Sequence, residues 1–220
     1  MQLNTSPRFA NDTIETFPCL NDRTSSTPFD AHYVYHPAWA ARIIKQVGCE
    51  KHVDISSTLH FCTMLSAFVP TEFYDYRPAN LALDNLLSQR ADLNHLHFAD
   101  NSIDSLSCMH TLEHIGLGRY GDSIDPDGDL NAINELARVT AFGGCLLLVV
   151  PVGRKKIAFN AHRIYDPKEF ASYLKGFELV NFSLITDDAR FITNASFIEA
   201  AEQNYGCGCY WFKKMGNGNR

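Results

Sequence analysis

The middle of the sequence combines two apolar runs with a helical pattern between them. Residues 103–109 are mostly small or apolar, and residues 145–150 form a continuous apolar run. Such runs indicate buried strands of a parallel sheet, because both faces of that sheet are covered. Between them, residues 129–139 place apolar side chains at helical spacing, and we expect Gly143-Gly144 to end this helix. The order strand, helix, strand predicts a βαβ unit.

Further helices and strands are predicted on both sides of this unit. The helices cover residues 36–47, 59–68 and 167–174, and the strands or β-rich runs cover 51–55, 72–75, 177–185 and 206–213. Pro37 and Gly48 frame the first helix, since proline is typical of a first turn and glycine of the residue after the end. We expect an irregular N-terminal arm over residues 1–35, a single domain over residues 36–215 and a short tail over residues 216–220.

Composition and charge exclude several classes of function. The 220 residues are 45% hydrophobic and 20% charged, an ordinary globular mixture, and the net charge of -6 argues against a nucleic acid held by its phosphates. Seven cysteines without a C-x-x-C pair predict a reducing compartment. There is no signal-peptide pattern and no apolar stretch near the roughly 20 residues that span a bilayer. We expect a cytoplasmic protein with no nucleic-acid or membrane partner; the oligomeric state stays open.

Three stretches of the sequence resemble a known enzyme class. They read L-H-F-A-D-N-S-I-D, H-T-L-E-H and E-L-A-R-V-T-A-F-G-G-C-L-L-L-V-V-P. These motifs resemble those of the class I S-adenosylmethionine-dependent methyltransferases. With D-I-S-S-T-L-H-F, Y-D-Y-R-P, G-R-Y-G-D and Y-G-C-G, the chain is more narrowly similar to a methyltransferase-like family of unknown function.

The resemblance implies a fold and a cofactor. The fold is a Rossmann-like α/β sandwich whose seven-stranded sheet is mostly parallel, with the last strand antiparallel between its neighbours. The cofactor is S-adenosyl-L-methionine, and the substrate is a small molecule, with a saccharide or related metabolite among the candidates. Because one fold serves many functions, a non-catalytic binding or scaffold protein with a degenerate cofactor loop is the alternative.

The first strand-to-helix turn departs from the methyltransferase pattern. Nucleotide-binding folds place glycines there so that the backbone can approach the ligand, whereas this chain has Ser56 and Ser57 after Asp54. Either the small hydroxyl residues allow a tight turn and donate to the cofactor's carboxylate, or the site has lost its cofactor. We favour the first interpretation, because Asp54 and the acidic residue after the second strand are both present.

Two acidic positions further along the chain complete the expected cofactor site. Asp75 ends the second strand, where a carboxylate accepts hydrogen bonds from ribose hydroxyls, and Tyr76 follows it. The alternative for Asp75 is an aspartate of an ordinary turn. By resemblance, Asp92 and Leu93 contact the adenine, although Asp92 could equally be a solvated loop residue.

Histidines supply the candidate catalytic groups. His110 follows the fourth strand and His162 follows the fifth, so we expect both to line one cleft, with His110 also beside the cofactor. The pattern H-x-x-E-H at His110 to His114 is a reversed zinc-protease motif. We predict no metal there, because glycines interrupt the segment soon after and no long helix can present both histidines.

A long polar loop and the segment after the fifth strand supply candidate substrate contacts. The loop covers residues 116–128 and carries Arg119 and Tyr120, and Arg163 lies in the later segment. Loops of this length are usually functional. Its aspartates do not match a calcium loop, because the glycine is misplaced and the closing glutamate is missing.

Overall fold

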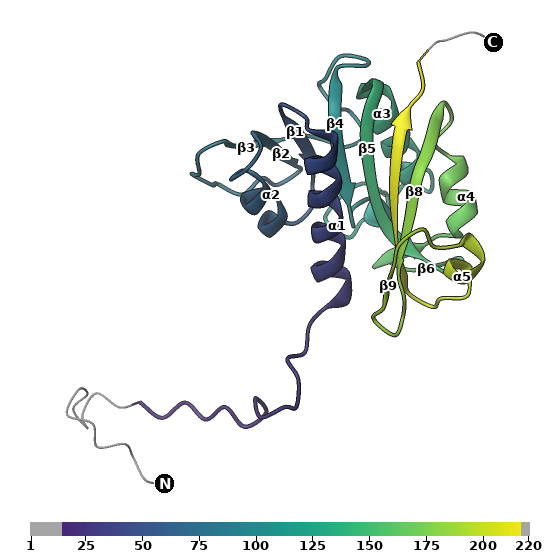
Figure 1. Ribbon diagram of the computed structural model, residues 1–220. Coiled ribbons are helices and arrows are strands. Elements are labelled where there is room, and N and C mark those ends of the chain that lie inside the picture. Colours follow the sequence, from purple (N-terminus) through teal and green to yellow (C-terminus); the bar gives the residue numbers. More distant parts are fainter. Residues whose placement is uncertain (1–14, 217–220) are drawn as a thin grey trace.

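A computed structural model describes residues 15–216 of the chain. Its centre is a single eight-stranded sheet with the order β3-β2-β1-β4-β5-β10-β8-β9 (Figure 1). The strands of this sheet are β1 (His52–Ile55), β2 (Thr71–Asp75), β3 (Leu86–Arg90), β4 (Ile103–Met109), β5 (Thr140–Val152), β8 (Phe177–Ile185), β9 (Phe191–Ile192) and β10 (Gly206–Lys214). A separate hairpin pairs β6 (Lys156–Ala158) with β7 (His162–Ile164).

The direction of the strands confirms the expected architecture. Strands β3, β2, β1, β4 and β5 are parallel, and β10 runs antiparallel between β5 and β8. The chain has eight strands in this sheet where seven were predicted, because the short β9 adds an antiparallel edge to β8. The predicted Rossmann-like sandwich with an inserted antiparallel last strand is therefore correct, and its strand count was one too low.

Helices cover both faces of the sheet. They are α1 (Ala31–Val47), α2 (Leu59–Leu65), α3 (Gly128–Val139), α4 (Pro167–Ser172) and α5 (Phe197–Ala201), with a 3-10 turn η2 (Leu112–His114). Side chains of β5 alternate between the two layers, as a strand's period of two requires. Leu146 and Leu148 pack in the layer with α3, whereas Leu147 and Val149 pack in the layer with α1 and α2. Both layers consist of buried apolar side chains, so the packed sheet holds the residues at its edges in place.

The first helix begins earlier than predicted. It starts at Ala31, because the Asp30 side chain caps it by accepting from the Tyr33 backbone N–H at 3.2 Å. Pro37 therefore lies inside the helix and not in its first turn. Residues 31–35 consequently belong to the folded domain and not to the arm predicted over residues 1–35.

The helix before β5 ends differently from the prediction. Thr140 stops α3 by donating its hydroxyl to the Leu136 carbonyl at 2.7 Å, and β5 begins at Thr140 without a glycine cap. Gly143 and Gly144 lie within β5, where the pairing with β4 shifts register. Gly143 has φ of +77°, and a side chain on Gly144 would meet the Ala141 carbonyl at 2.8 Å. The glycines thus form a strand irregularity, and the predicted helix end was wrong.

Strand β3, at one edge of the sheet, was missed by the sequence analysis, because its sequence is short and half polar. Residues 1–14 of the arm and residues 217–220 of the tail lie outside the described residues. No helix within residues 15–216 is both long and apolar enough to cross a membrane.

Candidate functional site

The turn between β1 and α2 lies where the sheet reverses its strand order, between β1 and β4. Ligands of open α/β sheets bind in the crevice at such a switch point. Ser56 has φ of +58°, the left-handed conformation in which glycine is usual. Its backbone N–H donates to the Tyr74 carbonyl at 2.7 Å, and its own carbonyl accepts from the Thr111 hydroxyl at 2.8 Å. The turn therefore has a glycine-like shape without glycine and is bonded to both neighbouring strands.

Asp54 supports this turn from inside the protein. It is completely buried, and its Oδ1 accepts from the Ser57 N–H at 3.0 Å and from the Cys62 thiol at 3.4 Å. The Ser107 hydroxyl donates to the other carboxylate oxygen. Burial raises the pKa of Asp54 to about 6, although these hydrogen bonds oppose the rise. Asp54 thus shapes the turn, and its oxygens do not face the crevice.

The two serine hydroxyls are also used within the fold. The Ser56 hydroxyl donates to the Tyr74 carbonyl at 3.3 Å, and the Ser57 hydroxyl accepts from the Met109 N–H at 3.0 Å. The sequence suggested that these hydroxyls donate to a cofactor. In the structure they fix the turn against β2 and β4.

The acidic residues on the β2 side face outward. Asp75 is half-buried at the end of β2, and one of its carboxylate oxygens accepts from the Arg77 N–H at 2.7 Å. Asp92 is exposed and accepts from the Asn94 N–H at 2.9 Å, while Leu93 between them is buried. Tyr76 is 48% exposed. Both carboxylates retain an oxygen for which the described residues offer no partner.

On the other side of the crevice, His110 lies among buried polar groups. It follows β4 directly and has φ of +57°. Its Nδ1 lies 2.9 Å from Oε1 of Glu113, and its Nε2 lies 3.4 Å from the Sγ of Cys207 on β10. All three side chains are buried. Sequence reasoning selected His110 but missed both of its partners, which come from η2 and from the last strand.

The contact between His110 and Glu113 is short and fully buried. Burial lowers the pKa of His110 to about 4 and raises the pKa of Glu113 to about 7. Each shift disfavours the charged form of its group, since desolvation penalises charge. A hydrogen bond joins Nδ1 to the carboxyl group, and the second carboxylate oxygen of Glu113 has no partner in the described part of the chain.

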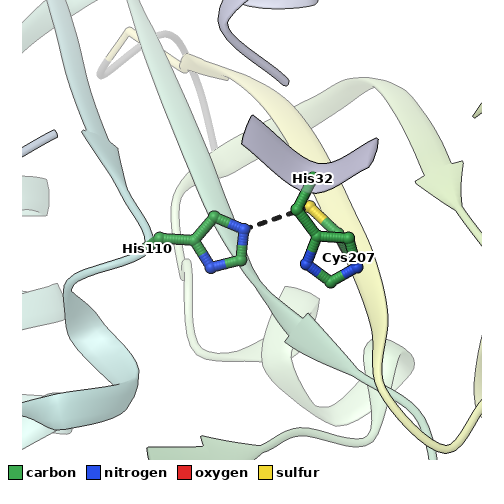
Figure 2. A group of neighbouring side chains, drawn as sticks. All are labelled: His32, His110 and Cys207. Carbon is green, nitrogen blue, oxygen red and sulfur yellow. Dashed lines mark hydrogen bonds between the residues drawn. The ribbon is translucent and has the colours of Figure 1, made fainter. Parts of the chain in front are cut away.

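The start of α1 closes over this cluster. The rings of His32, Tyr33 and His36 lie 5.4, 5.3 and 5.0 Å from the ring of His110. Figure 2 shows His32 from α1 and His110 from the end of β4 pointing toward Cys207. The sequence missed His32 and Tyr33 because they were assigned to the irregular arm, whereas His36 was placed in the predicted helix and given no role in the site. The spacing of four between His32 and His36 was the signal for one helix face.

His162 and His114 extend the cluster toward the hairpin. The ring of His162 lies 5.0 Å from that of Tyr205 and 6.5 Å from that of His114, and the Tyr205 ring stacks on His32 at 5.2 Å. His114 donates from Nδ1 to the Ala161 carbonyl at 2.7 Å. Burial lowers the pKa of both histidines. The structure therefore brings His110 and His162 to one cluster, linked through aromatic rings.

The candidate substrate contacts divide into two kinds. Arg119 and Tyr120 are exposed, and Arg119 stacks over the Tyr120 ring at 5.1 Å. Arg163 is only 6% exposed, and it donates to the Ile115 carbonyl at 2.6 Å and pairs with Asp129 at 3.5 Å. Arg163 thus holds the long loop in place from beneath. Arg119 also donates to the Ala161 carbonyl at 3.0 Å, so it and Tyr120 are exposed to a ligand but partly engaged within the fold.

A separate groove of about 1170 Å³ lies between α1 and α2. It is mostly apolar, with Phe61, Met64 and Phe68 among its lining residues. Its lining residues come from α1, α2 and the segments beside these helices, and of the site residues described above only Tyr33 is among them. The polar groups that chemistry requires are at the crevice, so we place the candidate site there.

Solved structures share this fold at low sequence identity. NodS, an N-methyltransferase of Bradyrhizobium japonicum WM9 in complex with S-adenosyl-L-homocysteine, has a TM-score of 0.58 and 14% identity over 81% of this chain and 85% of its own. The YcgJ protein of Bacillus subtilis has a TM-score of 0.55 and 14% identity over 83% and 100%. The [4+2]-cyclase SpnF has a TM-score of 0.55 and 12% identity over 81% and 80%.

These likenesses show the class I methyltransferase fold. No curated protein matches the sequence. A family model, by contrast, matches residues 83–205, which is more than half of the chain, and it covers the loop after β4, the hairpin and the last helix. The chain therefore belongs to the family described as Caenorhabditis protein of unknown function, DUF268.

Proposed function

We propose that this protein binds S-adenosylmethionine in the crevice between β1 and β4 and transfers its methyl group to a small molecule. The observation that carries the proposal is the β1–α2 turn, in which Ser56 holds the left-handed conformation at the switch point of the sheet. The relative NodS has S-adenosyl-L-homocysteine bound in the same fold. When bound, the cofactor would supply an electrophilic methyl group on its sulfonium.

The residues of the crevice fit such a cofactor. Asp75 offers an unused carboxylate oxygen for the ribose hydroxyls, and Asp92 with Leu93 offers a carboxylate and a buried apolar side chain for the adenine. Asp54, Ser56 and Ser57 keep the turn in shape from within. Their role in binding would be to position the backbone that lines the crevice.

The acceptor would enter beside the histidine cluster. Methyl transfer from a sulfonium needs chiefly alignment of the two reacting atoms, and exposed Arg119 and Tyr120 border the approach. A base is required only if the acceptor must lose a proton. His162 suits that role better than His110, because both ring nitrogens of His110 already have partners. Saccharides and related metabolites remain candidate acceptors.

A second candidate function is a binding or scaffold role without catalysis. It is favoured by the internal use of Asp54, Ser56 and Ser57, which leaves none of the three side chains free for a cofactor. Under this alternative, the fold and the turn persist, but the crevice binds no sulfonium compound.

Calorimetry with S-adenosylmethionine and S-adenosylhomocysteine separates the two candidates. Asp75→Ala should weaken binding by roughly 10- to 150-fold, because a hydrogen bond to a charged group contributes about 1.5–3 kcal/mol. Asp104→Ala is the matched control, since Asp104 is an exposed carboxylate near the opposite end of β4. If the full-length protein binds neither compound, the methyltransferase proposal fails and the scaffold alternative stands.

A further inference from the structure

The histidine cluster contains an arrangement typical of a transition-metal site. His32 of α1, His110 after β4 and Cys207 of β10 each offer a ligand atom, and these atoms all lie within 4.8 Å of one another (Figure 2). The measured contact between Nε2 of His110 and Sγ of Cys207 is 3.4 Å. Two ligands of a tetrahedral zinc ion stand about 3.6 Å apart when one is nitrogen and the other sulfur. The pair therefore already has nearly the spacing that a shared metal would impose.

The groups behind the candidate ligands also match a metal site. A metal-binding histidine usually donates its second ring N–H to a carboxylate or a backbone carbonyl, which orients the ring. Nδ1 of His110 lies 2.9 Å from a carboxylate oxygen of Glu113. With Nδ1 as the donor in this contact, the lone pair of Nε2 lies on the side of Cys207, 3.4 Å from its Sγ.

A neighbouring histidine gives an independent indication of a missing ligand. His36 is completely buried, and its Nδ1 donates to the His32 carbonyl at 2.7 Å. Its Nε2 then carries a lone pair, for which the structure provides no hydrogen-bond partner among residues 15–216. The ring stands 5.0 Å from that of His110. An unsatisfied buried nitrogen is costly, so a second imidazole with an unused lone pair borders the cluster.

A thiol–imidazole–carboxylate triad is the other chemistry that Cys207, His110 and Glu113 suggest. A nucleophile must be reached by its substrate, and Cys207 has no exposed surface. A triad also requires neither His32 nor His36. Coordination explains all of these residues and needs no access to the sulfur.

We infer that His32, His110 and Cys207 bind a single zinc-like divalent ion, with Glu113 orienting His110. Nitrogen and sulfur ligands favour Zn²⁺ over Mg²⁺ or Ca²⁺. This site differs from the H-x-x-E-H segment considered in the sequence, because only its first histidine takes part. The inference is independent of methyl transfer, so it stands or falls without the cofactor.

Metal titration of the full-length protein tests the site. After treatment with a chelator, the protein should bind one equivalent of Zn²⁺, and Co²⁺ should produce a thiolate-to-metal charge-transfer absorption band. Cys207→Ser should abolish this band and weaken Zn²⁺ binding by more than 100-fold. That loss exceeds the roughly 10- to 100-fold expected for Glu113→Gln, whose side chain acts only through His110.

Two further variants keep the test decisive. Cys209→Ser is the matched control, because Cys209 is equally buried on the same strand but does not belong to the ligand set. His32→Asn, at a half-buried position in the first turn of α1, serves if Cys207→Ser fails to fold, and it should also weaken Zn²⁺ binding by more than 100-fold. The inference is overturned if no Co²⁺ band forms, if the band survives Cys207→Ser, if Cys209→Ser removes it equally, or if His32→Asn binds Zn²⁺ like the wild type.

Discussion

The two sides of the crevice are built in different ways. On the β1 and β2 side, the turn is made by residues close in sequence, Asp54 to Ser57, and the outward-facing carboxylate of Asp75 follows one strand later. On the β4 and β10 side, His32, His110 and Cys207 come together from near the beginning, the middle and near the end of the chain. The first side is local and partly open to solvent, whereas the second is assembled over long distances and is buried.

This difference suits the open side to ligand binding and the buried side to proton or metal chemistry. Open carboxylates can exchange water for a ligand's hydroxyl groups at low cost, because they remain solvated when the site is empty. Buried imidazoles are held neutral, since burial lowers the pKa of His32 and of His110 to about 4. Neutral rings keep a lone pair that can bind a metal at physiological pH, whereas a pKa this low makes them weak proton acceptors.

The largest effect is expected on catalysis from the buried side. Once an acceptor is known, His162→Gln should lower kcat by roughly 10²- to 10⁴-fold and leave the affinity for S-adenosylhomocysteine unchanged. Steady-state kinetics and calorimetry measure the two quantities. His60→Gln, an exposed histidine on α2, is the control. A loss of only a few-fold would mean that alignment alone accelerates the reaction.

The next largest effect is expected where the long loop is fixed. Arg163→Met should lower the free energy of unfolding by about 3–5 kcal/mol, because it leaves the buried Asp129 carboxylate without its cation. Lys155→Met is the matched control, since it breaks the exposed pair with Glu169 and should cost less than about 1 kcal/mol. Urea unfolding compares the two variants. Equal losses would show that Arg163 does not anchor the loop.

A smaller effect is expected at the turn on the open side. Ser56→Val should destabilise the protein by about 1–3 kcal/mol, because a β-branched residue is strained at positive φ. Ser56→Gly should stay within about 1 kcal/mol of the wild type, since relief of strain offsets the greater freedom of the unfolded chain. Thermal unfolding measures both. If the two variants were equally stable, the turn would not require a glycine-like conformation.

The smallest effect is a pH dependence beneath the turn. His52 is buried between Ser105 and Ser107, with 2.8 Å to each hydroxyl, and burial lowers its pKa to about 3. As the pH falls, the unfolded state therefore binds a proton at His52 before the folded state does. The stabilising contribution of neutral His52 is present above pH 6.5 and is lost as the pH falls toward about 3.

Urea unfolding between pH 7 and pH 6 measures the onset of this loss, which amounts to less than about 1 kcal/mol over that range. The stability difference between wild type and His52→Gln should shrink by up to about 1.4 kcal/mol per pH unit below pH 6.5. Asp54 acts in the opposite direction, because its raised pKa of about 6 makes the folded state gain stability as the pH falls. Both proteins retain Asp54, so its effect largely cancels. A pH-independent difference would contradict the neutral state of His52.

Local patterns in the sequence were sufficient for most of the fold. Residues 103–109 and 177–185 match the bounds of β4 and β8 as predicted from the sequence, and the helix predicted from residue 167 begins there as α4. The errors occurred where tertiary contacts decide the outcome. Gly143 serves the pairing of β5 with β4, and no sequence window contains both strands.

The contrast between local patterns and tertiary contacts also explains which site residues could be predicted from the sequence. The turn and Asp75 were found because strand ends can be read from single segments. The contacts of His110 with His32 and Cys207 depend on how α1 and β10 meet across the sheet. Arg163 was assigned to the substrate because its burial under the loop has no local signal.

The insertion of β10 between β5 and β8 has a consequence for how the protein is made. During synthesis, β8 and β9 emerge before residues 206–214, yet they pair with the rest of the sheet only through β10. Until that strand has been made, the apolar edge of β5 is unpaired, and such edges promote wrong association between chains. The last strand is thus the closing step of folding. A nascent chain that pauses before it would be a natural client for chaperones.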